Sequence, residues 1–154
     1  MVRRLVAFVA ALIVMIVLGS LAHSLFVQQA WSSAAAMADS TAPGLTIGER
    51  ISWALSDLVG METRMASNAP PYGLLAGVAL LISFLAAGLV ARFTGMRTIV
   101  FAVAGAVAMF TLFTLLKMAV GTVGVFGARG MLGLAAQMTA GLIAGLTFAR
   151  LSQS

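Results

Sequence analysis

Four long apolar stretches constrain this chain more than any other feature of its sequence. They cover about residues 5–26, 72–91, 99–120 and 131–149. Each is close to the roughly 20 residues that cross about 30 Å of hydrocarbon as a helix. Helices satisfy their own backbone hydrogen bonds, which lipid cannot do, and the alternating polarity of barrel strands is absent. The sequence therefore predicts an all-α membrane protein with four transmembrane helices, forming a single domain over residues 1–154.

The composition agrees with a lipid environment. The chain is 62% hydrophobic and 8% charged, whereas about a quarter of a soluble domain is charged. Its nine Lys and Arg residues are spread along the sequence and form no basic patch interleaved with aromatics, so no nucleic-acid partner is expected. The absence of Cys excludes disulfides, thiolate chemistry and Cys-based metal sites. The expected partner is the lipid bilayer.

The first apolar stretch has two interpretations. Arg3 and Arg4 precede it, and Ala22 and Ser24 are small residues of the kind that a signal peptidase accepts. Its apolar run covers 18 residues to Ala22, which is longer than the 7–15 apolar residues of a typical signal peptide. We expect the first span to be retained. Cleavage, which would leave three spans, is the alternative.

Basic residues near the span ends predict the orientation of the chain, because cytoplasmic segments carry an excess of Lys and Arg. An arrangement with the N-terminus inside places five basic residues in short inner segments: Arg3, Arg4, Arg92, Arg97 and Arg150. It leaves four on the outer side: Arg50, Arg64, Lys117 and Arg129. We expect a multi-pass protein of the bacterial inner (plasma) membrane with both termini in the cytoplasm.

The connection between the first two spans, residues 27–71, contains all four acidic residues of the chain. Residues 32–44 are small and polar and end in Pro43 and Gly44, a pattern typical of irregular chain. Thr46 and Glu49 then have the spacing of a capping box, which marks the start of a helix.

A further helix is predicted over about residues 47–66. Its apolar residues recur at helical spacing and predict one apolar face: Ile47, Ile51, Ala54, Leu55, Leu58, Met61 and Met65. Glu62 is the one charged residue on that face. We expect an extracytoplasmic amphipathic helix that lies on the end of the bundle or in the lipid interface. A docking surface for a partner is the alternative.

The fourth span has a ridge of small residues with a single amide in it. The residues at four-residue spacing are Gly133, Gln137, Gly141 and Gly145. Small residues let two membrane helices approach closely, and an amide forms hydrogen bonds across the contact. We expect the ridge to pack against the second or third span, with a second protomer or a partner subunit as the alternative.

His23, the only histidine, lies about 18 residues into the first span. It is a weak candidate for the axial ligand of a haem or pigment, and a histidine bonded to a carbonyl or water is the favoured interpretation. Without Cys or an acidic neighbour in the sequence, a zinc site is not expected. Neither a nucleophile–base pair nor a phosphate loop is found, so we expect no enzyme activity, cofactor or metal.

Aromatic and basic residues near the predicted outer boundary have the pattern of interfacial anchors. Trp31, Trp53 and Tyr72 fall in outer-side segments, and Lys117 lies three residues before the end of the third span. A lysine in this position extends its ammonium group to the lipid headgroups while its stem stays in the apolar region.

Three functions are compatible with these features. The leading hypothesis is a structural or accessory subunit that packs in a membrane complex or homo-oligomer. The first alternative is a small transporter or channel for an apolar solute or lipid. The polar residues available to line its lumen are Ser83, Thr111, Thr114, Gln137 and Thr139. The second alternative is a cofactor-binding membrane subunit that uses His23.

Overall fold

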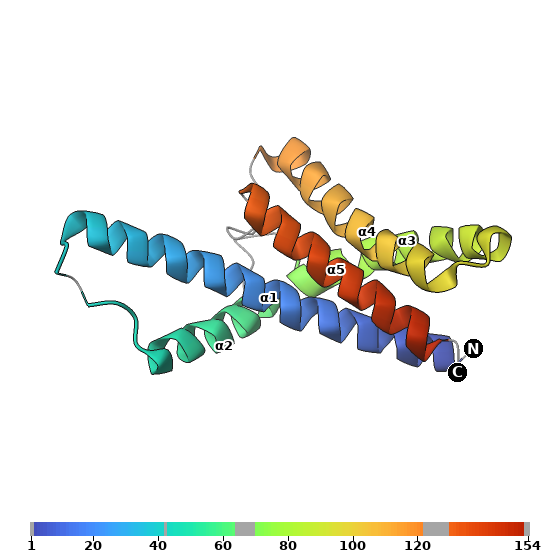
Figure 1. The fold of residues 1–154 in the computed structure, drawn as a ribbon, viewed down its shortest axis with the longest axis horizontal. Helices are drawn as coiled ribbons and strands as arrows, with labels where there is room; N and C mark the ends of the chain where they lie inside the picture. The colour runs from blue at the N-terminus through green and yellow to red at the C-terminus, as the bar shows by residue number, and fades with distance from the viewer. Residues whose placement is uncertain (1, 42, 64–69, 122–129, 153–154) are drawn as a thin grey trace.

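The computed structural model describes residues 2–41, 43–63, 70–121 and 130–152. In these residues the chain forms α1 (Val2–Ala38), α2 (Ile47–Thr63), α3 (Tyr72–Thr94), α4 (Arg97–Val120) and α5 (Met131–Leu151). All but α2 are long and apolar enough to cross a membrane. The prediction of an all-helical chain with four membrane-spanning helices is therefore confirmed (Figure 1).

The four spans form an antiparallel bundle in which α5 lies between α1 and α4, and α3 packs on α4. Both chain termini lie at one end of this bundle (Figure 1), where Nε of Arg3 donates a 3.0 Å hydrogen bond to the carbonyl of Leu151. The turn between α3 and α4 lies at the same end. There Gly95 adopts the left-handed conformation (φ 68°) that ends a helix at little cost for glycine. We call this end the terminal end.

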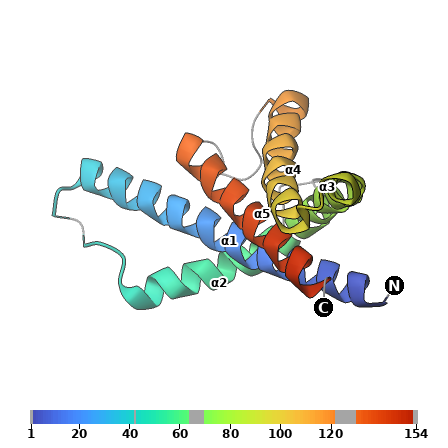
Figure 2. The same ribbon diagram turned by 45° about the vertical axis from the view of Figure 1, so that its right-hand side comes forward.

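α1 is longer than the sequence predicts. Its 37 residues extend about 55 Å at helical rise, and its second half projects beyond the other spans (Figures 1 and 2). Residues 32–38 are helical, so the prediction of irregular chain is wrong there. The physical reason is a run of alanines, the strongest helix formers, at residues 34–36. The helix ends before Asp39, whose carboxylate accepts hydrogen bonds from Thr41 that lower its pKa.

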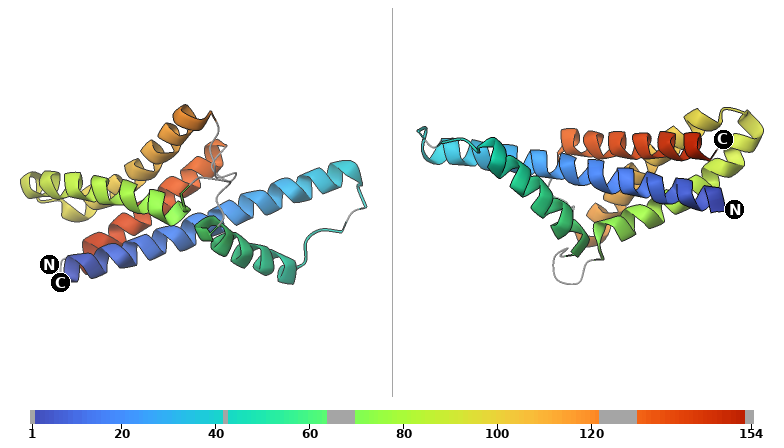
Figure 3. Two further views of the ribbon diagram at one scale, coloured as in Figure 1. Left: turned by 180° about the vertical axis from the view of Figure 1, so that it is seen from behind. Right: turned by 90° about the horizontal axis from the view of Figure 1, so that it is seen from below.

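α2 begins with the capping-box contacts. The amide and the hydroxyl of Thr46 donate to Oε2 of Glu49 at 2.8 and 2.7 Å, and the amide of Glu49 donates to Oγ1 of Thr46 at 3.3 Å. These hydrogen bonds hold the pKa of the exposed Glu49 carboxyl below its usual value. From this start α2 runs back from the projecting part of α1 toward the first residue of α3 (Figure 3).

The apolar residues predicted to share one face of α2 differ in their exposure. Met61 is buried, and Ala54 and Leu58 are half-buried, whereas Ile47, Ile51 and Leu55 are exposed. Met65, Arg64 and the predicted end of this helix lie outside the described residues. The face predicted as continuous is therefore divided between a bundle contact and an open side.

Glu62, the charged exception on the predicted apolar face, caps α3. Its two carboxylate oxygens accept hydrogen bonds of 3.0 and 3.1 Å from the amide of Gly73. The first amides of a helix have no partner within the helix, and the positive end of the helix dipole favours a carboxylate there. The apparent exception is thus the group that satisfies the start of the second span.

The closest helix contact is between α4 and α5. A Cβ atom at Gly105 would overlap the carbonyl oxygen of Gly141, and one at Gly145 would overlap the carbonyl oxygen of Phe101. The two backbones therefore touch directly, as small residues allow in membrane helices. This contact brings Phe101 of α4 beside the last turns of α5.

Candidate functional site

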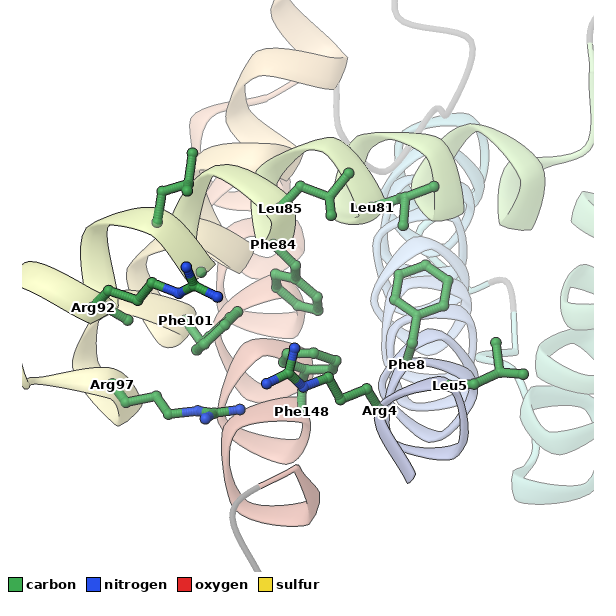
Figure 4. A pocket seen from close by; sticks show the side chains of 13 residues that line it. Arg4, Leu5, Phe8, Leu81, Phe84, Leu85, Arg92, Arg97, Phe101 and Phe148 are labelled. Carbon is green, nitrogen blue, oxygen red and sulfur yellow. The ribbon is translucent and has the colours of Figure 1, made fainter. Parts of the chain in front are cut away.

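A cavity of about 660 Å³ lies at the terminal end of the bundle. The first turns of α1, the second half of α3, the start of α4 and the end of α5 line it. Figure 4 shows phenylalanines and arginines around it, together with leucines. We call it the arginine–phenylalanine cavity.

Each spanning helix supplies one phenylalanine to the cavity. Phe84 of α3 stacks on Phe148 of α5 with ring centroids 4.7 Å apart, and Phe101 of α4 lies 4.8 Å from Phe148. Phe8 of α1 meets Phe84 edge to face at 6.4 Å. Such aromatic contacts stabilise packing by roughly 0.5–1.5 kcal/mol per pair beyond the area they bury. The four rings form a well-packed apolar floor.

Three arginines from three helices surround this floor. Arg4 of α1, Arg92 of α3 and Arg97 of α4 direct their guanidinium groups toward the phenylalanines (Figure 4). Arg97 lies over the ring of Phe101 at 5.5 Å and donates a 2.9 Å hydrogen bond from Nη2 to Oγ of Ser152. Its Nε is buried and forms no hydrogen bond among the described residues. One donor of Arg97 is thus oriented by Ser152, and another has no acceptor in the described part of the chain.

Among the described residues no acidic side chain lines the cavity. All four acidic residues of the chain lie between Asp39 and Glu62, in the segment that includes α2. The three guanidinium groups therefore have no acidic side chain to balance them in the described part of this site. Because guanidinium is always charged and binds carboxylate or phosphate through paired hydrogen bonds, the site has the chemistry of an anion receptor.

A wall of leucines continues the cavity toward the lipid-facing surface. These residues are largely exposed on the bundle and line the cavity: Leu5, Leu81, Leu85 and Leu89. Gly88, between Leu85 and Leu89 on α3, leaves open space beside its backbone. The arrangement can hold a negatively charged group beside the arginines and an apolar chain along the phenylalanines and leucines.

This cavity is not among the features predicted from the sequence. Arg4, Arg92 and Arg97 serve there only as indicators of orientation, and the phenylalanines have no predicted role. A signal was nevertheless present, because Phe8, Phe101 and Phe148 each lie within a few residues of a span end that carries arginine. In an antiparallel bundle such positions share one depth. Only the packing of the helices shows that they converge on one cavity.

Gln137 is completely buried and joins three helices in the half of the bundle away from the cavity. Its Oε1 accepts a 2.8 Å hydrogen bond from the hydroxyl of Tyr72, and its Nε2 donates a 2.9 Å bond to the carbonyl of Gly19. Tyr72 is 1% exposed, so it packs inside the bundle, and its position at the membrane interface stays a prediction. The buried amide supplies the acceptor that its hydroxyl needs, and Gly19 leaves room for that hydroxyl.

The small-residue ridge of α5 is used within the chain. Gly133 is buried, Gly141 and Gly145 face α4, and Gln137 reaches α1. The second and third spans are the two expected contacts, and the glycines of the ridge pack against the third span, α4. The ridge is therefore not a free surface for a second protomer.

His23 is half-buried on α1, and Asp57 of α2 acts on it electrostatically. Asp57 is far from His23 in the sequence, and it comes within electrostatic reach because α2 folds back along α1. Among the described residues no group of three or more His, Asp or Glu side chains could hold a metal ion.

The predicted anchors lie where α1 and α2 meet and at the far end of α4. Trp31 and Trp53 pack edge to face with ring centroids 5.7 Å apart, and Trp31 is 44% exposed. Lys117 is exposed in the last turns of α4.

The polar residues considered for a lumen do not line one. Thr111, Thr114 and Thr139 are exposed on the outside of the bundle. The hydroxyl groups of Thr114 and Thr139 bond to carbonyls of their own helices. Ser83 donates to the carbonyl of Ala104 across the α3–α4 contact. Gln137 is engaged in the buried contact with Tyr72 and Gly19.

The chain matches no protein-family model, and it matches neither a curated protein nor a solved structure. The geometry of the arginine–phenylalanine cavity therefore carries the functional inference.

Proposed function

We propose that this chain is a membrane protein that binds an anionic amphiphile in the arginine–phenylalanine cavity. The observation that carries the proposal is the convergence of Arg4, Arg92 and Arg97, without any acidic side chain, around a floor of four phenylalanines. Guanidinium groups at the membrane interface attract anionic lipid headgroups. Ser152 holds the guanidinium group of Arg97 at the cavity, where it adds positive charge for such a headgroup.

The size of the cavity supports a ligand that is only partly enclosed. A volume of about 660 Å³ is in the range of sites that bury a drug-sized molecule. It fits a phosphate-bearing headgroup together with the first part of an acyl chain. The remainder of the chain follows the leucine wall of Leu5, Leu81 and Leu85 into the bilayer. The proposal keeps the lipid ligand of the transporter or channel alternative, but the lipid binds at the side of the bundle and no channel is needed.

Native mass spectrometry of the purified full-length chain in detergent tests the proposal. We expect phosphatidylglycerol to bind in preference to phosphatidylcholine, with a mass shift of one lipid per chain. Arg92→Gln and Arg97→Gln are expected to lower the bound fraction, since each removes a charge from the headgroup site. Lys117→Gln is the matched control, because it removes one positive charge at the opposite end of the bundle.

Gly88→Leu separates binding from stability. No atom lies within 4 Å of a Cβ at Gly88, so a side chain introduced there begins in open space at the cavity wall. Replacing a helical glycine also favours the folded state by roughly 0.5–1 kcal/mol. We expect this variant to be as stable as the parent chain and to lose the lipid. Retention of the lipid by Gly88→Leu, or equal loss from Lys117→Gln, would contradict the proposal.

The charge distribution supports an orientation with the terminal end in the cytoplasm of a bacterial cell. Five basic residues lie at or near this end: Arg3, Arg4, Arg92, Arg97 and Arg150. At the other end the described basic residues are Arg50 and Lys117, while Arg64 and Arg129 lie outside the described residues. The excess of positive charge marks the cytoplasmic side of membrane proteins. In this orientation α2 is extracytoplasmic and the cavity faces the inner leaflet.

A second candidate function is that of an accessory subunit in a membrane assembly or homo-oligomer. The ridge of α5 no longer supports it, because Gly141 and Gly145 are used in the contact with α4. The feature that favours it is the projection of α1 beyond the other spans (Figure 2), with Met37 89% exposed near its end. The same mass measurement reports the number of copies. A single copy that retains lipid favours the binding protein, and a defined oligomer favours the subunit.

A further inference from the structure

One side of α2 is attached to the bundle. Met61 is buried, Nε2 of Gln28 donates a 3.0 Å hydrogen bond to the carbonyl of Arg50, and Trp31 packs on Trp53. These contacts fix how the helix is rotated about its axis. They therefore decide which of its remaining residues face away from the protein.

The side that faces away carries a line of large aliphatic residues. These residues, spaced by four and 56–78% exposed, are Ile47, Ile51, Leu55 and Val59; we call them the α2 stripe. Residues spaced by four lie on one side of a helix. Exposed polar residues of the same helix lie beside the stripe: Ser52, Ser56 and Thr63. α2 thus has a face toward the bundle, an apolar face and a polar face.

Hydrogen bonds between the helices show how deep α2 reaches. Gln137 lies six residues from the start of α5 at Met131, which is about 9 Å along the helix axis. The amide of Gln137 bonds to the hydroxyl of Tyr72, the first residue of α3. α3 therefore begins well below the level at which α5 begins.

The last turn of α2 reaches this deep start of α3. Glu62 accepts its hydrogen bonds from the amide of Gly73, and a Cβ on Gly73 would meet the side chain of Ile16, far inside the apolar part of α1. α2 begins beside Gln28, at the level of the projecting part of α1. The helix therefore descends from outside the apolar region into it.

We propose that α2 enters the leaflet on its own side of the membrane and that the α2 stripe contacts lipid acyl chains. Lipid removes these four aliphatic side chains from water, while the neighbouring polar face is directed to the headgroups. The depth of the Glu62–Gly73 contact argues for lipid as the occupant, because the lower half of α2 lies at hydrocarbon level. α2 then fills the space beside α1 that the deep start of α3 leaves open. This inference is independent of the arginine–phenylalanine cavity.

The absence of Cys makes the test direct, since every introduced cysteine is a unique label site. Leu55→Cys and Val59→Cys place a nitroxide on the α2 stripe, and Ser56→Cys places a control on the polar face of the same helix, between them in sequence. The full-length variants are reconstituted in vesicles of phosphatidylethanolamine and phosphatidylglycerol. Electron paramagnetic resonance then measures the collision of each label with oxygen, which concentrates in hydrocarbon, and with a water-soluble nickel chelate.

We expect the ratio of oxygen to nickel collisions to be severalfold higher at residues 55 and 59 than at residue 56, with the deepest label at 59. Equal ratios at all three positions would place the stripe in water and overturn the proposal. Labels at 55 and 59 that collide with neither reagent would show a protein surface covering the stripe and would overturn it equally. Unchanged fluorescence from the chain's two tryptophans, which meet at the α1–α2 contact, verifies that each variant is folded.

Discussion

At the scale of single residues, one amide organises the half of the bundle away from the cavity. Gln137 is 0% exposed and uses both ends of its amide, accepting from Tyr72 and donating to the carbonyl of Gly19. A buried polar group without a partner is costly, whereas a paired one specifies a unique arrangement. Gln137 therefore defines the relative depth of α1, α3 and α5.

Removing this amide should destabilise the bundle measurably. Gln137→Leu loses both hydrogen bonds and leaves the buried Tyr72 hydroxyl without its acceptor, so we expect a loss of about 1–3 kcal/mol. Tyr72→Phe loses one bond and should cost about 1 kcal/mol. Denaturation in mixed micelles measures both changes. Thr139→Val, at an exposed position of the same helix, is the control and should change stability by less than about 0.5 kcal/mol. If the free energy of unfolding of Gln137→Leu equals that of the parent chain, the hydrogen bonds add no net stability.

At the scale of elements, the contact between α4 and α5 depends on the absence of side chains. At Gly105, Gly141 and Gly145 the partner's backbone lies where a Cβ atom would be. In lipid, helices associate through close packing, because the hydrophobic effect does not favour one helix over the lipid around it. This contact also sets Phe101 beside Phe148, so the floor of the cavity depends on it.

The smallest side chain should be enough to separate the two helices. Gly105→Ala places a methyl group against the carbonyl of Gly141, so we expect a loss of about 1–3 kcal/mol. Gly88→Ala is the matched control, because no atom lies within 4 Å of its Cβ and the variant should be neutral or slightly stabilised. The unfolding midpoints of the two variants, measured in the same detergent, should therefore move in different directions or by clearly different amounts. Equal shifts of the two midpoints would mean that α4 and α5 move apart to accommodate the methyl group without loss of stability.

At the scale of the whole molecule, charge is divided between the two ends. Every acidic side chain lies between Asp39 and Glu62, whereas the termini and the α3–α4 turn carry arginines only. Because the four spans are antiparallel, the termini and this turn must lie on one side of the membrane. The arginine–phenylalanine cavity opens on that side, and α2 lies toward the other.

Labelling with a membrane-impermeant maleimide tests this arrangement. Val2→Cys and Met96→Cys, both at exposed positions of the terminal end, should react only in inside-out vesicles. Ser56→Cys on α2 should react in intact bacterial spheroplasts. If Val2→Cys and Met96→Cys both react in spheroplasts instead, the orientation is opposite to the one proposed. Reaction of these two variants from opposite sides would contradict the antiparallel bundle itself.

The number and type of the spanning helices follow from the sequence alone. A run of about 20 apolar residues can satisfy its backbone in lipid only as a helix, so the existence of the spans does not depend on what they pack against. The same holds for the start of α2, since Thr46 and Glu49 meet within one turn. Local rules also explain the one local error, because the alanines at residues 34–36 extend α1 through a segment predicted to be irregular.

Tertiary structure alone decided which faces meet. Helical spacing predicts that the apolar residues of α2 share one side of the helix. It does not show whether protein, lipid or water covers each of them. The packing of α2 on α1 buries Met61 and leaves Ile47 and Leu55 exposed. For the same reason Tyr72 is buried, Asp57 lies near His23, and the ridge of α5 meets α4. The arginine–phenylalanine cavity belongs to this second group. Its residues come from four helices, and although their positions near span ends predict a common depth, no local spacing shows that they face one cavity.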